Sequence, residues 1–189
     1  MKVVQPPNPF WIETELNADM TSYLWEQIDN SRVNAKNTLV GHHKRNPLRL
    51  PDPDHKLLDY MVEESKGLDY LYRPNLRRDD FWVNFQSKHE FNPFHIHHAT
   101  ISFVIWMKIP YEYDNERKTE EAKGIGCECK SGCFEILYTD ILGRILNYLY
   151  PLSSNSEGTV LIFPSQLSHQ VYPFYTSDEE RISISGNLL

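Results

Sequence analysis

Histidines are concentrated in one short stretch of the 189-residue chain: four of its eight lie between His89 and His98, and a fifth, His169, stands alone further on. Side chains alternate between faces in an extended segment, so His95 and His97 point one way and His98 the other. Two imidazoles on one face are half of a transition-metal site, which His169 could complete from a later strand. H-x-H is short and common, so the spacing alone leaves a metal site and ordinary structural histidines equally open; His89 and His98 are expected to be structural or solvent-facing.

A second group with chemical potential begins twelve residues after His169, at Arg181. Alternation along this segment places Arg181, Ser183 and Ser185 on one face of a strand. A guanidinium beside a hydroxyl binds a carboxylate through a bidentate, charge-assisted pair and one further hydrogen bond. If Arg181 is buried, a protein acid or an acidic ligand must accompany it; the alternative is an arginine at the rim, paired with the acids of residues 178–180.

Taken in order, these residues resemble the iron(II)- and 2-oxoglutarate-dependent oxygenase superfamily. The more specific similarity is to the phage-type 2OG-Fe(II) oxygenases, relatives of the prolyl-hydroxylase-like branch, and it covers most of residues 81–189. No single motif is specific, but their combination and order are. The motifs are FWVN (81–84), NPxHxH (92–97), FPSxLxH (163–169) and RISISGN (181–187).

The resemblance implies a mainly β fold, a double-stranded β-helix (jelly roll, cupin-like) with N-terminal flanking helices. It also implies an oxygenase, most simply a hydroxylase, that uses Fe(II), 2-oxoglutarate and dioxygen. His95 and His169 would bind iron, and Arg181 with Ser183 would bind the distal carboxylate of 2-oxoglutarate. Most of the superfamily has Asp or Glu where this chain has His97. We take His97 as the third ligand, with His98 in reserve; the other possibility is that water completes the site.

The sequence leaves two other hypotheses open, one for a different enzyme and one for a protein that is not an enzyme. A three-His, cupin-like metal dioxygenase that does not use 2-oxoglutarate would explain His97 but not the Arg181 and Ser183 pair. A non-enzymatic jelly-roll binding module would need neither. For an oxygenase we expect a small-molecule or peptidyl substrate, which the sequence does not identify further, and the sequence indicates no oligomeric state.

Supporting residues can be proposed on the strands around the histidines. Asn84 and Gln86 share a face of the preceding strand, so they could bind the co-substrate or orient a ligand; Asn84 is our candidate for co-substrate binding. Trp106, Tyr138 and Tyr148 could form cavity walls, although aromatic residues at strand spacing more often belong to the core.

Two other clusters are expected to carry no site. Cys127, Cys129 and Cys133 form C-x-C-x3-C, which lacks a fourth ligand and the usual spacing for zinc. The basic run 42–45 (HHKR) lies in a polar loop and is expected to be a solvated face.

The elements that must position these residues divide the chain in two. Apolar spacing predicts two helices in the first 75 residues, capped by Asn17 and Asp54. From residue 80 the pattern changes to short strands separated by turn residues. We therefore expect one domain, with a helical flank (1–79) and a jelly-roll core (80–189) that carries an insertion around 112–132. The predicted strands are 81–86, 101–109, 133–138, 145–150, 159–163, 170–172 and 181–185.

Composition excludes several functions. The formal net charge is −7, so no basic field is present to bind nucleic acid. No apolar run approaches the length of a membrane span, and residues 1–10 do not form a secretory signal. Three cysteines clustered in one segment are not a disulfide framework. We expect a reduced, cytoplasmic protein, in the host cytoplasm if it is phage-encoded.

Overall fold

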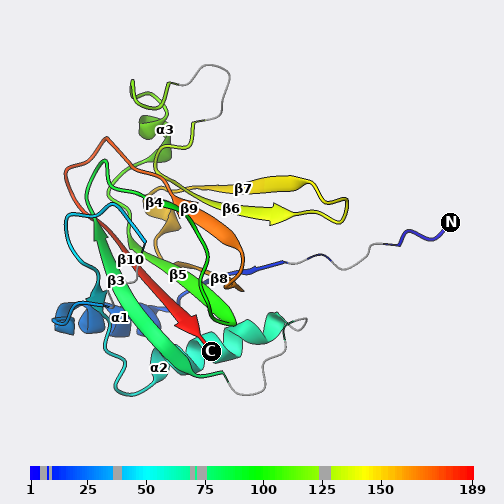
Figure 1. Cartoon of the computed structure of the whole chain (residues 1–189). Coiled ribbons are helices and arrows are strands. Elements are labelled where there is room, and N and C mark those ends of the chain that lie inside the picture. Colours follow the sequence, from blue (N-terminus) through cyan, green and yellow to red (C-terminus); the bar gives the residue numbers. More distant parts are fainter. Residues whose placement is uncertain (5–7, 9, 36–39, 69–70, 72–75, 124–128) are drawn as a thin grey trace.

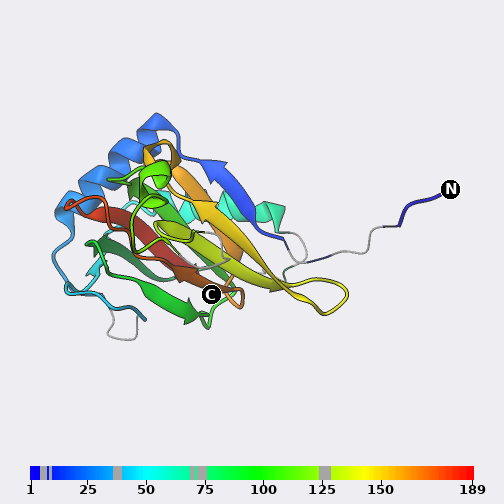
Figure 2. The same ribbon diagram turned by 90° about the horizontal axis from the view of Figure 1, so that it is seen from above.

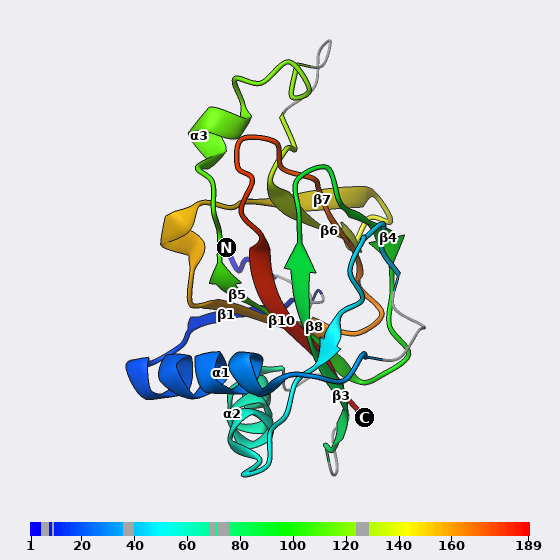
Figure 3. The same ribbon diagram turned by 90° about the vertical axis from the view of Figure 1, so that its left-hand side faces the viewer.

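The structure is a computed structural model, which describes residues 1–4, 8, 10–35, 40–68, 71, 76–123 and 129–189. Two antiparallel sheets face each other, and two helices cover the outer face of the larger sheet, on the side away from the smaller one (Figure 1, Figure 3). The helices are α1 (Ala18–Asn30) and α2 (Lys56–Glu64), followed by a short 3-10 turn (Ser65–Gly67). No helix in the described part of the chain has the length and apolar character needed to cross a lipid bilayer.

Within the described residues, the major sheet has six strands and the minor sheet four. The major sheet runs β1 (Ile12–Glu15), β8 (Thr159–Pro164), β5 (Ile101–Lys108), β10 (Arg181–Leu188), β3 (Arg78–Gln86) and β2 (Leu48–Arg49). The minor sheet runs β4 (Asn92–His95), β9 (Ser168–Val171), β6 (Cys133–Thr139) and β7 (Ile145–Pro151). The hairpin of β6 and β7 extends beyond the other strands (Figure 2). This is the predicted jelly roll, and the seven predicted strands are present with bounds that differ by up to three residues.

The chain forms two cores because the central strands of the major sheet are covered on both faces. In β5, Phe103 and Ile105 pack against the helices, whereas Val104 and Trp106 pack between the two sheets. This alternation follows from the period of two in a strand. It explains why seven consecutive residues of β5 are buried. The side chains that point between the two sheets can be polar or apolar, because the helices cover only the other face.

The two helix starts show one confirmed and one wrong prediction. Asn17 caps α1, since its side-chain oxygen accepts a hydrogen bond from the Met20 N–H at 2.8 Å. The predicted cap of α2, Asp54, is replaced by Asp52. A turn before the helix folds the Asp52 carboxylate back over the first helical turn, where it accepts hydrogen bonds from the backbone N–H groups of Leu57 and Leu58.

The insertion between β5 and β6 contains the short helix α3 (Tyr113–Glu116) and is anchored to the core at both ends. The Glu116 carboxylate is fully buried and accepts hydrogen bonds from the Ser131 hydroxyl and the Tyr175 and Thr176 N–H groups. Within the described residues Cys129 is a free thiol, and the buried Cys133 thiol donates to the Ser131 carbonyl at 3.5 Å; Cys127 lies outside them. The insertion is therefore tied to the loop that precedes β10.

Candidate metal centre and its cavity

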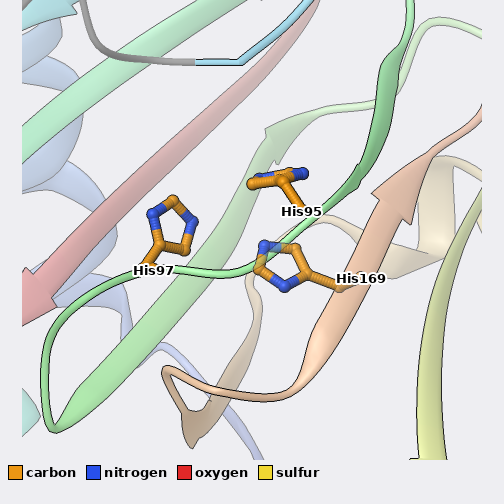
Figure 4. A group of neighbouring side chains, drawn as sticks. All are labelled: His95, His97 and His169. Atoms are coloured by element: carbon orange, nitrogen blue, oxygen red, sulfur yellow. The ribbon is translucent and has the colours of Figure 1, made fainter.

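Three histidines meet between the two sheets. His95 ends β4 and lies directly opposite His169 of β9 in the register of the minor sheet. His97 lies two residues beyond β4, where its backbone N–H donates to the Ser165 carbonyl at 2.9 Å. The ring centroids are 4.3 Å (His95–His169), 5.1 Å (His95–His97) and 5.2 Å (His97–His169) apart, and the rings converge on one space (Figure 4).

The hydrogen bonds of two of these rings fix which nitrogen is free. Nδ1 of His95 lies 2.8 Å from the Pro93 carbonyl oxygen, and Nδ1 of His169 lies 2.9 Å from that of Leu167. A carbonyl oxygen can only accept, so each Nδ1 carries the proton and each Nε2 keeps its lone pair. Metal-binding histidines use the same arrangement, with the second ring nitrogen donating to a carbonyl or carboxylate.

Burial keeps these imidazoles neutral at pH 7. It lowers the pKa of His169 to about 3, with further lowering by His95 and His97 against a raising hydrogen bond to Leu167. It lowers the pKa of His97 to about 4, with smaller effects from His95 and His98, and it lowers the pKa of His95 as well. Neutral imidazole is the form that binds a metal ion.

The donor set suits a first-row transition metal. One ligand atom from each of the three histidines lies within 4.8 Å of the others. Imidazole nitrogens favour ions such as iron, zinc and copper over magnesium or calcium, and three ligands on one side leave coordination positions open for small molecules. His98, the reserve ligand of the sequence prediction, is not part of this cluster.

Arg181 is the first residue of the polar row on β10 that also contains Ser183 and Ser185. It is buried, with 2% of its surface exposed. Its guanidinium donates from Nη1 to the Tyr111 hydroxyl at 2.6 Å, and from Nη2 to Oε1 of Gln86 at 2.7 Å and the Tyr172 carbonyl at 3.1 Å. All three acceptors are uncharged, and no Asp or Glu of the described chain forms an ion pair with Arg181.

The acids that could have paired with Arg181 are engaged elsewhere at the surface. The alternative of an Arg181 at the rim, paired with these acids, is wrong. Arg181 is buried, and the three carboxylates just before it in sequence each have another basic partner. The pairs are Asp178 with Lys88, Glu179 with Lys108 and Glu180 with Arg45.

A cavity of about 120 Å³ connects the histidines with Arg181. Ser183 and Ser185 line it as the alternation of β10 predicts, and Nδ2 of Asn84 lies 3.4 Å from both hydroxyl oxygens. Among the described residues that line this cavity there is no Asp, Glu or Lys. It therefore combines a cluster of three histidines, the buried cation of Arg181 and neutral polar groups.

Of the three aromatic residues predicted as cavity walls, one lines the cavity and two do not. Trp106 lines the cavity together with Phe134, Phe163 and Trp82. Tyr138 and Tyr148 do not line it; they pack edge-on against Trp11 at the margin of the core between the sheets. Position within the sheet accounts for the difference. Tyr138 and Tyr148 share the inward face with Phe134 and Ile136, but Tyr148 lies on β7, two strands from His169, and Tyr138 lies beyond Ile136 toward the end of β6.

Three residues of the basic run at 42–45 are exposed, as expected of a solvated face, but His43 is not, and the run also contributes to the cavity lining. The His43 side chain is only 10% exposed, and its Nε2 lies 2.8 Å from Oδ1 of Asn92. The Lys44 N–H donates to Glu90, which is itself buried. Residues 40, 41, 43 and 45–47 line the cavity. A non-local β-bridge between His42 and Phe91 fixes this position, and no local sequence pattern indicates it.

A comparison with protein families decides the family. The model described as "Putative 2OG-Fe(II) oxygenase" matches residues 80–187, more than half of the chain. The chain belongs to this family of 2OG-Fe(II) oxygenases. It is thus an oxidoreductase of the dioxygenase class with Fe(II) as cofactor and 2-oxoglutarate as co-substrate, as the motifs predict; a phage source is not indicated.

Solved structures show the same fold. A prolyl-4-hydroxylase from Pseudomonas putida aligns with a TM-score of 0.55 at 16% identity, covering 95% of this chain and 92% of that one. A prolyl hydroxylase from Trichoplax adhaerens, in complex with a hypoxia inducible factor peptide fragment, aligns with 0.52 at 13% identity (93% and 81% covered). An oxygenase of the 2OG-Fe(II) family from Burkholderia pseudomallei gives 0.51 at 14% identity (93% and 83% covered). No protein among the curated sequences matches this chain.

Proposed function

We propose that His95, His97 and His169 bind the Fe(II) of this oxygenase, and that Arg181 and Ser183 bind the distal carboxylate of 2-oxoglutarate. The reaction we assign is hydroxylation of a C–H group on a small-molecule or peptidyl substrate. Bound Fe(II) supplies the activation of dioxygen, coupled to oxidative decarboxylation of 2-oxoglutarate. Asn84 supports the serine row that the co-substrate would contact.

The buried, acid-free position of Arg181 carries this proposal. A buried charge without an opposite charge is costly, because desolvation of the guanidinium is not offset by a Coulombic partner. Three neutral hydrogen-bond acceptors satisfy part of the guanidinium and leave its charge uncompensated. A carboxylate entering from the cavity would supply the missing charge, with Ser183 as the adjacent hydroxyl donor.

The composition of the metal cluster supports the same ligand. Three neutral imidazoles leave the full charge of the ion uncompensated, whereas the usual carboxylate would remove one unit. A 2-oxo dicarboxylate brings two negative charges, one to each end of a cavity that holds no acidic lining residue. This argument, with the family, favours 2-oxoglutarate over a three-His dioxygenase that does without it and over a non-enzymatic jelly roll.

The assignment of His97 as a ligand rests on its convergence with His95 and His169. The hydrogen bond from its backbone N–H to Ser165 holds the loop so that the ring faces the other two. Its ring also packs against Trp82, with centroids 5.9 Å apart, which limits its rotation. Water in place of His97 would leave a neutral, mostly buried imidazole beside the ion with no bond to it.

The test is an anaerobic titration of 2-oxoglutarate into Fe(II)-loaded protein, followed by the visible charge-transfer band of a chelated 2-oxo acid. We expect the band in the wild type, its loss in His95→Ala and His97→Ala, and a much weaker affinity in Arg181→Ala. His98→Ala is the matched control, since this neighbouring histidine is outside the cluster. A normal band in Arg181→Ala would refute the anchor, and a normal band in His97→Ala would refute the third ligand.

A further inference from the structure

A chain of hydrogen bonds runs from the proposed co-substrate anchor to the insertion between β5 and β6. We propose that Tyr111 and Gln86 are positioning residues for Arg181, and that the end of the insertion at Gly132 sets the affinity for 2-oxoglutarate through Tyr111. This inference rests on the proposed role of Arg181. It adds residues from outside the strand that carries the anchor.

The guanidinium of Arg181 has five N–H donors, and the protein uses three of them. Nη2 donates to Gln86 and to the Tyr172 carbonyl, and Nη1 donates once to Tyr111. Among the described residues, Nε–H and the second Nη1–H have no hydrogen-bond acceptor. The three bonds come from three different segments of the chain, so they fix the plane of the guanidinium and determine which donors are left for a ligand.

Gln86 can hold this position because both ends of its amide are engaged. Its Oε1 accepts from Arg181, and its Nε2 donates to the Glu90 carbonyl. The side chain is 4% exposed, so water does not compete for either group. Rotation of the amide would break both bonds at once, and the orientation of Gln86 is thereby fixed.

Tyr111 acts on the ligand only through Arg181. Its hydroxyl proton is donated to the Gly132 carbonyl at 2.8 Å, so the oxygen is left to accept from Arg181. A hydroxyl arranged in this way has no proton to offer a carboxylate. The ring is stacked on Phe174, with centroids 4.7 Å apart and planes 23° apart, and burial raises the pKa of Tyr111 to about 12. Tyr111 is thus a neutral, rigid acceptor.

The position of Tyr111 depends in turn on Gly132. Gly132 has a φ of +69°, and its N–H donates to the Pro173 carbonyl at 2.7 Å. A Cβ at this position would lie 2.7 Å from Cε2 of Tyr111. Only glycine allows the insertion to return to the core this close to the ring. A change at Gly132 would therefore move Tyr111, and with it one of the three bonds that hold Arg181.

The experiment measures 2-oxoglutarate binding to the Mn(II)-loaded full chain by calorimetry. It also measures the steady-state KM and kcat for 2-oxoglutarate turnover. We expect Tyr111→Phe and Gly132→Ala each to weaken 2-oxoglutarate binding about tenfold, because the guanidinium must then be ordered when the ligand binds. The kcat at saturating 2-oxoglutarate and the Mn(II) affinity should stay within about twofold. Tyr113→Phe is the matched control: it removes another hydroxyl of the insertion, one that donates to the Cys129 carbonyl.

Double variants separate this inference from the proposed function. In an Arg181→Ala background, Tyr111→Phe should cause no further loss of affinity. An equal loss in both backgrounds, or a Tyr111→Phe affinity within twofold of the wild type, overturns the positioning role. Unchanged binding in Arg181→Ala alone overturns the anchor itself. Thermal unfolding identifies variants that fail to fold, and Gln86→Asn, which withdraws one acceptor by a methylene, then decides in their place.

Discussion

Acid should destabilise the metal-free protein through its buried histidines, and His169 gives the clearest case. Its pKa is about 3 in the folded chain against about 6.5 for an exposed imidazole. The folded state therefore binds fewer protons than the unfolded state between these values. The stabilisation is complete above pH 6.5 and is lost as the pH falls toward 3.

The size of the effect follows from the shift. Each pH unit within this window costs about 1.4 kcal/mol per group. Between pH 7 and pH 4.5, His169 alone should remove about 2 to 3 kcal/mol from the free energy of unfolding. This is a large share of the roughly 5–15 kcal/mol that is typical of a domain. His95 and His97 act in the same direction.

The assay is urea unfolding of metal-free wild type and His169→Gln at pH 7, 5.5 and 4.5. Carboxylates titrate in both proteins, so the difference between the two pH profiles isolates the histidine. The wild type should lose about 2 to 3 kcal/mol more than the variant over this range. Parallel profiles would show that folding does not lower the pKa of His169, and would contradict the burial of a neutral imidazole from which this prediction is derived.

The remaining predictions concern the metal, the core and the link between the ligands. Fe(II) at 100 times its Kd should stabilise the protein by about 2.7 kcal/mol, seen as a higher Tm, and His95→Ala should abolish this rise. Gly186→Ala should lower the free energy of unfolding by about 1 to 3 kcal/mol, measured in denaturant, because a Cβ would lie 2.4 Å from Phe81 and 2.6 Å from Phe103. 2-Oxoglutarate should raise the Fe(II) affinity in metal titrations, and His97→Asp should reduce that increase; equal enhancement in both would count against the prediction.

The parts of the site that lie on regular strands could be predicted from the sequence. Alternation placed Arg181, Ser183 and Ser185 on the cavity face, with Ile182 and Ile184 toward the helices. This works because the side-chain period of a strand is two and the sheet has an apolar layer on one side. The family motifs then supplied the distant partner of the histidine pair, which spacing alone could not.

The parts that depend on loop contacts could not be predicted. His43 reaches the cavity mouth through contacts with Glu90 and Asn92, nearly fifty residues away. Asp52, not Asp54, caps α2. Both residues are aspartates, so residue type does not distinguish them, and the path of the turn before the helix decides. Local propensity carries no information on such non-local contacts, so these positions required the fold.

The expected coupling between iron and co-substrate follows from where this chain places charge. In the proposed site, three imidazole ligands would give the ion no negative charge, and the cavity lining adds only arginines and neutral groups. The charge must come from the dianion, so each ligand improves the site for the other. Coupling free energies are reciprocal, and 2-oxoglutarate binding must therefore strengthen by the same factor when iron is present. An aspartate at His97 would supply part of that charge beforehand, which is why His97→Asp should bind iron well alone and gain less from 2-oxoglutarate.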